Sequence, residues 1–383
     1  MFRVTTNRTL AVMAAAAALS ALTLGCATAA ANDSSLPKPA AAKSPAAPQI
    51  AVYRWGAPKG PAQVDAFAAW LGQPGIWGED FQPSQHWYGV EGGSWQTGPW
   101  SEWKKKQAGR KLILSVTLLP GGWNRSGPTT GPDAGKPVSF TAAAAGDYNS
   151  HFKALAENLV KAGLGDSILR LGWEMNGGWY TWRAGNNEKL FAEYWRQIVT
   201  TMRAVPGAQD LKYCFNPASG WLQFPAEACY PGDDYVDYIG VDLYDQSWAP
   251  NTYPLPKDAT ADDILTRQKL AWKELLWGNH GLMFWSKFAA DHKKPFTIPE
   301  WGVCHRGDGH GGEDNPFFVE QMAKFINDPA NNVAWHCYFD VTAGDGDHLL
   351  SPGAPGEKPT VFPQSSAKFK ELFGGPSLSA SGK

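Results

Sequence analysis

The sequence lacks a charge excess of either sign. Its 383 residues carry 34 Lys and Arg against 36 Asp and Glu, a formal net charge of −2. A near-neutral chain offers little long-range attraction to a polyanion, so nucleic acid and an anionic membrane surface are disfavoured as partners. The basic run Lys104–Lys106 is too short to alter this, and we interpret it as a solvated helix face.

The signatures of a bound metal or nucleotide are also missing. The five cysteines include no close pair of the kind that structural zinc sites use. No glycine-rich phosphate loop follows the first predicted strand, which disfavours a doubly wound nucleotide-binding sheet. We therefore expect no cofactor and no metal.

Long apolar runs are confined to the N-terminus. Arg3 and Arg8 precede "LAVMAAAAALSALTL", which is too short to span a bilayer comfortably. This pattern predicts a secretory signal over residues 1–31. Two processing routes are open: cleavage before Asn32, or acylation of Cys26 in the lipoprotein-like "TLGC". Either route predicts an extracellular or cell-surface protein, and the second adds a lipid tether.

Composition divides the remainder of the chain. Residues 32–49 are rich in Pro, Ala and Ser and lack apolar periodicity, which indicates a linker. We expect one catalytic domain over 50–376, a disordered tail over 377–383, and a monomer. An even number of cysteines in an exported domain suggests disulfides. Cys214 and Cys229 lie on one predicted strand and the connection after it, and Cys304 and Cys337 lie at the adjacent seventh and eighth strands. Pairing neighbours in the barrel gives Cys214–Cys229 and Cys304–Cys337, one of three connectivities.

Strand and helix patterns alternate through the domain. Eight short apolar segments such as "KLILSVTLL" and "PFTIPEWG" are each followed by helical sequence, although the fifth helix is faint. Alternation of this kind implies a parallel sheet, and eight units imply a (β/α)8 TIM barrel of the α/β class.

Tryptophan is abundant, with 19 residues. Its flat apolar face and single N–H donor suit the binding of amphipathic rings, and many of these tryptophans flank Gly, Pro and polar residues. The excess predicts a carbohydrate-binding surface in addition to an aromatic core.

Two glutamates end predicted strands. Glu174 ends the fourth and Glu300 the seventh, and the carboxyl ends of barrel strands share one mouth. Glycoside hydrolysis requires one protonated acid to assist the leaving oxygen and one ionised acid to attack carbon or activate water. Nearby aromatic rings exclude water and raise the pKa of the first acid.

The domain, from about Ile50 to Phe373, resembles glycoside hydrolase family 26. The motif "LRLGWEMNGGWYTW" implies that Glu174 is the acid/base, and "IPEWG" implies that Glu300 is the nucleophile of a retaining double displacement. The resemblance further implies the following substrate-binding residues: Tyr244 in "GDDYVDYIGVDLYD", Trp179, and Trp335 on the eighth strand. The partner would be a polysaccharide or oligosaccharide.

The sequence departs from the mannan-cleaving members in two places. Trp173 stands before the acid/base where those members usually have His, and His336 follows Trp335 where many have Arg. We keep β-1,4-mannan as the first substrate and a β-glucan or an actinobacterial envelope glycan as the second. A catalytically silent carbohydrate-binding lipoprotein is the alternative from another class, which the presence of both glutamates and Tyr244 disfavours.

Four further features of the sequence bear on the site. Arg170 either points inward and holds Glu300 ionised or supports the core, and Asn176 either bonds a sugar hydroxyl or caps a turn. Trp123, on the third-strand loop, is expected to contact sugar. The loop His305–Pro316 is rich in His and Asp; we favour a substrate-side loop with Asp314 as the N-cap of the next helix over a metal site.

Overall fold

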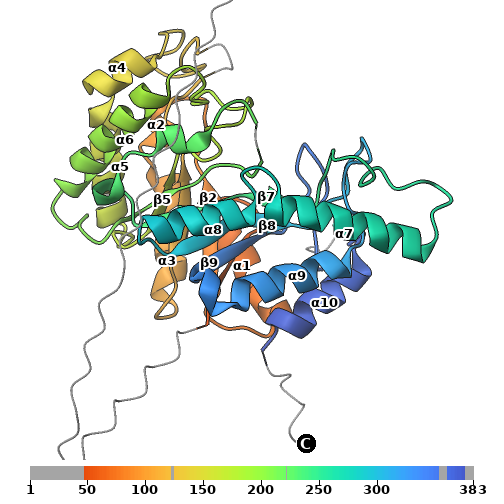
Figure 1. Cartoon of the computed structure of the whole chain (residues 1–383). Coiled ribbons are helices and arrows are strands. Elements are labelled where there is room, and N and C mark those ends of the chain that lie inside the picture. Colours follow the sequence, from red (N-terminus) through yellow and green to blue (C-terminus); the bar gives the residue numbers. More distant parts are fainter. Residues whose placement is uncertain (1–46, 122–124, 221, 353–359, 376–383) are drawn as a thin grey trace, which may run out of the picture. The chain divides into compact units, whose positions relative to one another are not determined.

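The computed structural model describes residues 47–121, 125–220, 222–352 and 360–375, all within the unit Pro45–Lys383 (Figure 1). The predicted signal at 1–31 with Cys26, most of the linker at 32–49, Trp123 and the tail at 377–383 lie outside the described residues. None of the described helices is long and apolar enough to cross a membrane.

The described strands form one closed parallel barrel. Their order is β6-β5-β4-β3-β2-β1-β9-β8-β7, and the additional pairing of β6 with β8 closes the ring. Their bounds are β1 Gln49–Tyr53, β2 Trp77–Phe81, β3 Leu112–Val116, β4 Ile168–Leu171, β5 Lys212–Phe215, β6 Tyr238–Gly240, β7 Leu243–Tyr244, β8 Phe296–Gly302 and β9 Val333–Phe339.

The sixth barrel strand is interrupted. It consists of β6 and β7, separated by Val241 and Asp242, so β8 and β9 are the seventh and eighth barrel strands. The predicted (β/α)8 barrel is confirmed.

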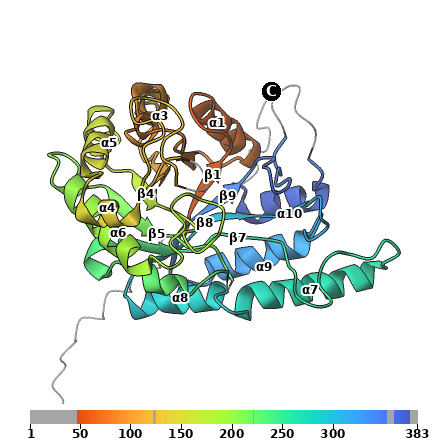
Figure 2. The same cartoon turned by 90° about the horizontal axis from the view of Figure 1, so that it is seen from above.

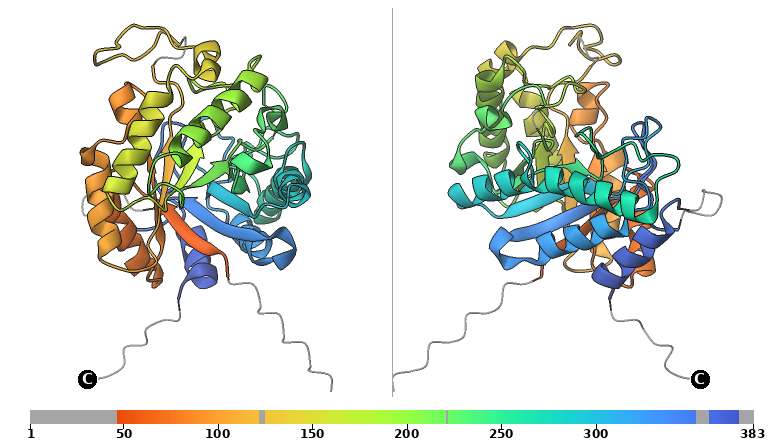
Figure 3. Two further views of the ribbon diagram at one scale, coloured as in Figure 1. Left: turned by 90° about the vertical axis from the view of Figure 1, so that its left-hand side faces the viewer. Right: turned by 45° about the vertical axis from the view of Figure 1, so that its right-hand side comes forward.

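Helices surround the strands on the outside of the barrel, as the view from above shows (Figure 2). Their bounds are α1 Gly60–Leu71, α2 Trp87–Val90, α3 Ser94–Lys105, α4 Phe140–Ala145, α5 Asn149–Lys161, α6 Glu188–Arg203, α7 Ala261–Trp277, α8 Leu282–Asp291, α9 Pro316–Asn327 and α10 Pro363–Phe373. The faint fifth helix is replaced by two 3-10 turns, η1 Ala226–Cys229 and η2 Asp233–Tyr235; a third, η3, spans Pro329–Asn331. Figure 3 shows the same ring from two sides.

Alternation along each strand divides the core into two layers. On β4, Leu169 and Leu171 pack in the large layer between strands and helices, whereas Ile168 packs in the small cluster inside the barrel. That inner cluster contains Ala51, Ile113, Ile168, Cys214, Trp335 and Cys337, all buried. The same alternation sends Arg170 inward, toward the mouth.

Candidate active site

Glu174 stands just beyond β4 in a strained turn. Its φ is 52°, a left-handed value that is uncommon for a residue other than Gly, Asn or Asp. The Glu174 N–H donates to the Asn216 carbonyl over 2.7 Å, which ties this turn to the end of β5. Gly172 precedes it with φ 53°, and a Cβ there would lie 2.6 Å from a Leu118 side-chain carbon. Backbone strain of this kind persists only where the surrounding structure enforces it, and it clusters at functional sites.

Glu300 lies on β8 and is 5% exposed. Both of its carboxylate oxygens accept charge-assisted or phenolic hydrogen bonds: Oε1 accepts from Arg170 Nη2 and Oε2 from the Tyr244 hydroxyl, each over 2.6 Å. Burial, followed by the charge of Glu300, raises the pKa of Tyr244 well above its usual value, so that hydroxyl keeps its proton and donates. Each oxygen of Glu300 therefore has a donor that fixes its position.

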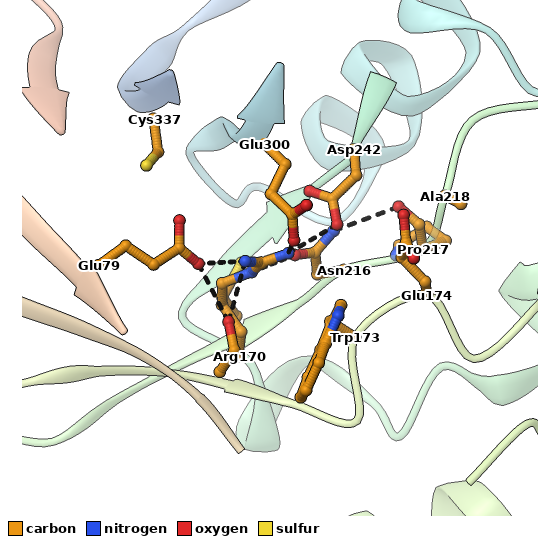
Figure 4. Close-up of polar contacts among 12 residues, drawn as sticks. Glu79, Arg170, Trp173, Glu174, Asn216, Pro217, Ala218, Asp242, Glu300 and Cys337 are labelled. Carbon is orange, nitrogen blue, oxygen red and sulfur yellow. Dashed lines mark hydrogen bonds and ion pairs between the residues drawn. The ribbon is translucent and has the colours of Figure 1, made fainter. Parts of the chain in front are cut away.

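Arg170 is completely buried at the centre of the site (Figure 4). All five of its N–H donors have an acceptor. Nε donates to Asn216 Oδ1 over 2.5 Å, Nη1 to Glu79 and to Ser115 Oγ, and Nη2 to Asp242 Oδ2 over 2.6 Å as well as to Glu300. Of the two orientations considered from the sequence, the structure has the inward one, toward Glu300.

One guanidinium faces three carboxylates in this buried cluster, those of Glu79, Asp242 and Glu300. Burial raises the pKa of Glu79 to about 7, against the opposing attraction of Arg170, and raises the pKa of Asp242 well above its usual range. Burial therefore works against the charged forms of Glu79 and Asp242, and the attraction of Arg170 opposes it. Asp242 and Glu300 both line the cleft, and Glu300 also accepts from the Tyr244 hydroxyl.

The surroundings of Glu174 favour its protonated form. Burial, and then the negative charge of Glu300, raise the pKa of Glu174 to about 8. The Trp179 indole N–H donates to Glu174 Oε2 over 2.7 Å, which opposes the shift and fixes the carboxyl group. Near pH 7 Glu174 therefore keeps its proton, and it lies in the same cleft as Glu300, which accepts from Arg170 and Tyr244.

A cleft of about 820 Å³ opens above these groups, which is within the range of ligand-binding pockets. Glu174, Trp179, Tyr244 and Glu300 all line it. Its walls come from loops after several strands and from the end of α7, with these further residues: Tyr180, Ala218, Leu222, Gln246, Trp248, Glu274, Asn279, Arg306, Phe339 and Asp345.

Trp173, the unusual residue before Glu174, packs beside the cleft rather than in it. It is 4% exposed, and its ring meets Phe81 edge-on at 5.3 Å. Its Nε1–H donates to the Tyr180 hydroxyl over 2.9 Å, and Tyr180 stacks on Trp182 at 4.4 Å. Tyr180 lines the cleft and was not singled out from the sequence, although it lies within the quoted motif.

Asn176 fixes a turn. Its Nδ2 donates to the Ala218 carbonyl and its Oδ1 accepts from the Ala218 N–H, both over 2.9 Å, and the residue is 1% exposed. Of the two interpretations drawn from the sequence, the structural one matches these contacts.

The assignment of Trp335 as a sugar platform is wrong. Trp335 is fully buried in the cluster inside the barrel and pairs with Gln49, the first residue of β1. It lies toward the N-terminal end of β9, which continues to Phe339 at the mouth. Phe339 is the β9 residue that lines the cleft.

The predicted disulfides are also wrong, because all four cysteines among the described residues are free and buried. Cys214 lies inside the barrel, whereas Cys229 packs in the outer layer. Cys337 is inside the barrel against Glu79, whereas Cys304 lies beyond the end of β8 beside Gly346. Cysteines on neighbouring parts of the barrel thus lie in different places, and the expected pairs do not meet.

The loop His305–Pro316 is held by protein contacts. His305 Nδ1 lies 2.6 Å from Glu313 Oε2. The expectation that Asp314 caps α9 is wrong, because Asn315 is the N-cap of that helix. Asp314 accepts instead from the N–H groups of Gln364 and Ser365 at the start of α10. Among the residues that the structure describes, no group of three His, Cys, Asp or Glu side chains could hold a metal.

Sequence reasoning missed the residues that surround Arg170: Glu79, Ser115, Asn216 and Asp242. The available signal was a polar side chain in an otherwise buried strand, as in "WGEDF" on β2 and "GVDLY" in the sixth barrel strand.

Residues 149–256 match the model of glycosyl hydrolase family 26. The matched segment includes Arg170, Glu174, Trp179 and Tyr244. A mannan endo-1,4-beta-mannosidase of Bifidobacterium adolescentis is 27% identical over 240 residues, which are 57% of this chain and 22% of the mannosidase. Endoglucanase H of Acetivibrio thermocellus is 32% identical over 119 residues, 27% of this chain and 12% of that protein. The chain thus spans less than a quarter of either relative.

Solved structures show the same fold. A double mutant of the Cellulomonas fimi endo-beta-1,4-mannanase superposes with a TM-score of 0.56 at 17% identity, covering 85% of this chain and 71% of the mannanase.

Proposed function

We propose that the chain is a member of glycosyl hydrolase family 26, whose model matches residues 149–256, and that it is a retaining endo-β-glycosidase that cleaves a polysaccharide backbone. One observation carries the proposal: a single cleft holds Glu174, whose pKa is raised to about 8, and Glu300, which accepts from Arg170 and Tyr244. Acid-assisted glycoside cleavage requires one carboxyl group that keeps its proton and a second that can attack the anomeric carbon from the same cleft.

The reaction proceeds in two displacements. In the first, Glu174 gives its proton to the glycosidic oxygen while the Glu300 carboxylate attacks the anomeric carbon and forms a glycosyl ester. In the second, Glu174, now ionised, removes a proton from water, which attacks the same carbon and releases Glu300. Two inversions leave the β-configuration unchanged.

Each neighbour of Glu300 supports these steps. Arg170 and Tyr244 hold the two oxygens in fixed positions, which reduces the reorganisation needed before attack. Ester formation neutralises Glu300, and this removes the negative charge that raises the pKa of Glu174. The pKa of Glu174 then falls, which suits its change from acid to base.

β-1,4-Mannan is the first substrate that we propose, since the Bifidobacterium relative is a mannan endo-1,4-beta-mannosidase. A β-glucan is the second. Trp173 favours it, because an indole packed on Phe81 and bonded to Tyr180 replaces the polar side chain that the mannan-cleaving members carry. The Acetivibrio relative is an endoglucanase.

The test is a screen of the purified protein against mannans, β-glucans, xylans and envelope glycans, followed by reducing-end release. We expect cleavage of one class, and loss of that activity in Glu300→Gln. Binding without cleavage by the wild-type protein would instead support the non-catalytic carbohydrate-binding alternative and contradict the proposal.

We also propose export, on the basis of the N-terminal pattern over residues 1–31. Intact-mass analysis of the native protein distinguishes the routes. A chain that begins at Asn32 without lipid supports secretion, an acylated Cys26 supports a membrane tether, and retention of Met1 contradicts both.

A further inference from the structure

Trp248 is an exposed tryptophan that lines the cleft and that the mechanism above does not use. It lies four residues beyond Tyr244, on the segment that follows β7, and its side chain is 57% exposed. Exposure of this extent leaves much of the residue accessible to solvent. A large apolar surface in a cleft that also holds Glu174 and Glu300 requires an explanation.

The indole packs against the loop His305–Pro316. The His310 ring stacks on Trp248 with centroids 5.2 Å apart and planes at 21°, and the Arg306 guanidinium lies 5.1 Å from the indole centroid. A cation at this distance from an indole face is attracted by it.

The bracing side chains are themselves fixed. Arg306 makes a bidentate ion pair with Asp308, through Nε to Oδ1 over 3.0 Å and Nη2 to Oδ2 over 2.9 Å. Asp308 Oδ1 also accepts from the His310 N–H over 3.0 Å, and Arg306 Nη1 donates to Gln246 Oε1 over 3.1 Å. One carboxylate thus positions both groups that support Trp248.

The two segments are joined along their backbones as well. The Ser247 N–H donates to the His310 carbonyl over 3.1 Å, and His310 Nδ1 lies 2.9 Å from the Ser247 carbonyl. Below them, the buried Asp245 accepts from Tyr253 over 2.8 Å and from Asn315 over 2.7 Å. The indole is therefore held in place before any ligand arrives, which lowers the entropy cost of binding.

We propose that Trp248, braced by the loop His305–Pro316, is the platform of a second subsite that stacks on a pyranose ring of the bound chain away from the bond cleaved between Glu174 and Glu300. The ligand is a β-linked hexopyranosyl oligosaccharide whose ring presents a flat apolar C–H face. This inference rests on the proposed function and assigns a role to the His- and Asp-rich loop. Trp179 occupies the position at Glu174 itself, so a sugar on Trp248 belongs to a different unit of the same chain.

The experiment compares kcat/KM over a ladder of β-1,4-linked manno- and gluco-oligosaccharides of increasing length. Trp248→Ala should lose about tenfold or more on substrates long enough to reach the platform and clearly less on the shortest substrate cleaved, with the loss mainly in KM. Trp248→Phe should retain most of the wild-type value. Trp277→Ala is the matched control, since Trp277 is 65% exposed at the end of α7 and does not line the cleft; it should leave the ladder unchanged.

The bracing role has its own test. His310→Ala should reproduce part of the length-dependent loss, whereas His310→Phe, which keeps a ring to stack on Trp248, should restore the wild-type profile. Equal losses at every length in Trp248→Ala, or no loss at any length, would overturn the proposal.

A wild-type protein that cleaves no member of the ladder would count against the proposed function alone. In that case the subsite is tested by equilibrium binding of a hexasaccharide to Glu300→Gln and to Glu300→Gln/Trp248→Ala. Weaker binding by the double variant supports the platform, and equal binding contradicts it.

Discussion

The Trp179 indole N–H donates to Glu174 Oε2 over 2.7 Å. Because this hydrogen bond stabilises the ionised carboxylate, it restrains the increase in the pKa of Glu174 that burial and Glu300 cause. The acid strength of the catalytic acid is therefore set jointly by exclusion of water, by the neighbouring charge and by one indole N–H.

Replacing Trp179 by Phe tests this relationship. Phe keeps an aromatic ring but has no N–H donor, so the pKa of Glu174 should rise further. The decline of kcat/KM on the alkaline side, which we expect near pH 8 in the wild-type protein, should move to higher pH. Trp277→Phe should not move it. An unchanged or lowered alkaline limb in Trp179→Phe would show that the hydrogen bond does not control Glu174.

The raised pKa of Glu174 should also make the stability of the fold depend on pH. The pKa of Glu174 is raised from 4.5 to about 8, so between these pH values the folded protein holds a proton that the unfolded chain has released. Stability from this group is therefore lost as pH rises through that window. Glu174→Gln cannot ionise, and we expect it to be more stable than wild type by about 1–3 kcal/mol at pH 9, a range that allows for solvent at the mouth.

The two proteins should be nearly equal below about pH 4, where Glu174 is protonated in both the folded and the unfolded state. Denaturant unfolding of both at a series of pH values measures the difference. Glu79 and Asp245, whose pKa values burial raises to about 7, are present in both and cancel. A difference that is constant with pH would contradict the assignment.

Arg170 should be the costliest single polar residue to remove. Arg170→Met leaves the buried carboxylates of Glu79, Asp242 and Glu300 without their cation, and breaking a buried pair in this way costs about 3–5 kcal/mol. The loss should shrink as pH falls, because protonation neutralises the carboxylates. Arg203→Met is the control: Arg203 makes a partly exposed pair with Asp237 at 3.8 Å, for which we expect about 0–1 kcal/mol. Equal destabilisation of the two variants would contradict the central role of Arg170.

The cysteines give a direct chemical test. In a Cys26→Ser variant purified without reductant, all four remaining thiols should react with a thiol reagent after unfolding in guanidinium, and little should react in the folded protein because all four are buried. Fewer than four thiols in the unfolded protein would reveal a disulfide that the structure lacks.

The barrel and its two acids were predictable because both follow from local patterns. Buried apolar strands alternate with amphipathic helices, and parallel strands bring their carboxyl ends to one mouth, so Glu174 and Glu300 meet there. The same closure pairs Arg170 with Glu300, which is 130 residues further along the chain. The resemblance of the fourth- and seventh-strand motifs supplied their roles.

The errors have a common physical origin. The apolar pattern of β9 does not tell where along the strand the mouth begins, so Trp335 was placed in the cleft although it lies at the opposite level of the barrel. Strand adjacency does not tell which layer a side chain enters, so the pairing of Cys214 with Cys229 failed. The partners of Arg170 come from strands that are distant in sequence, and only the closed barrel brings Glu79 and Asp242 to it.

The central claim is that Glu174 and Glu300 act by double displacement. Proton NMR of the first product released from a β-linked polysaccharide tests it most directly, because anomeric configuration is read before mutarotation. The account predicts a β-anomer at early times, which then equilibrates with the α-form. An α-anomer as the first product would contradict it, since it would require a water rather than Glu300 to attack the anomeric carbon.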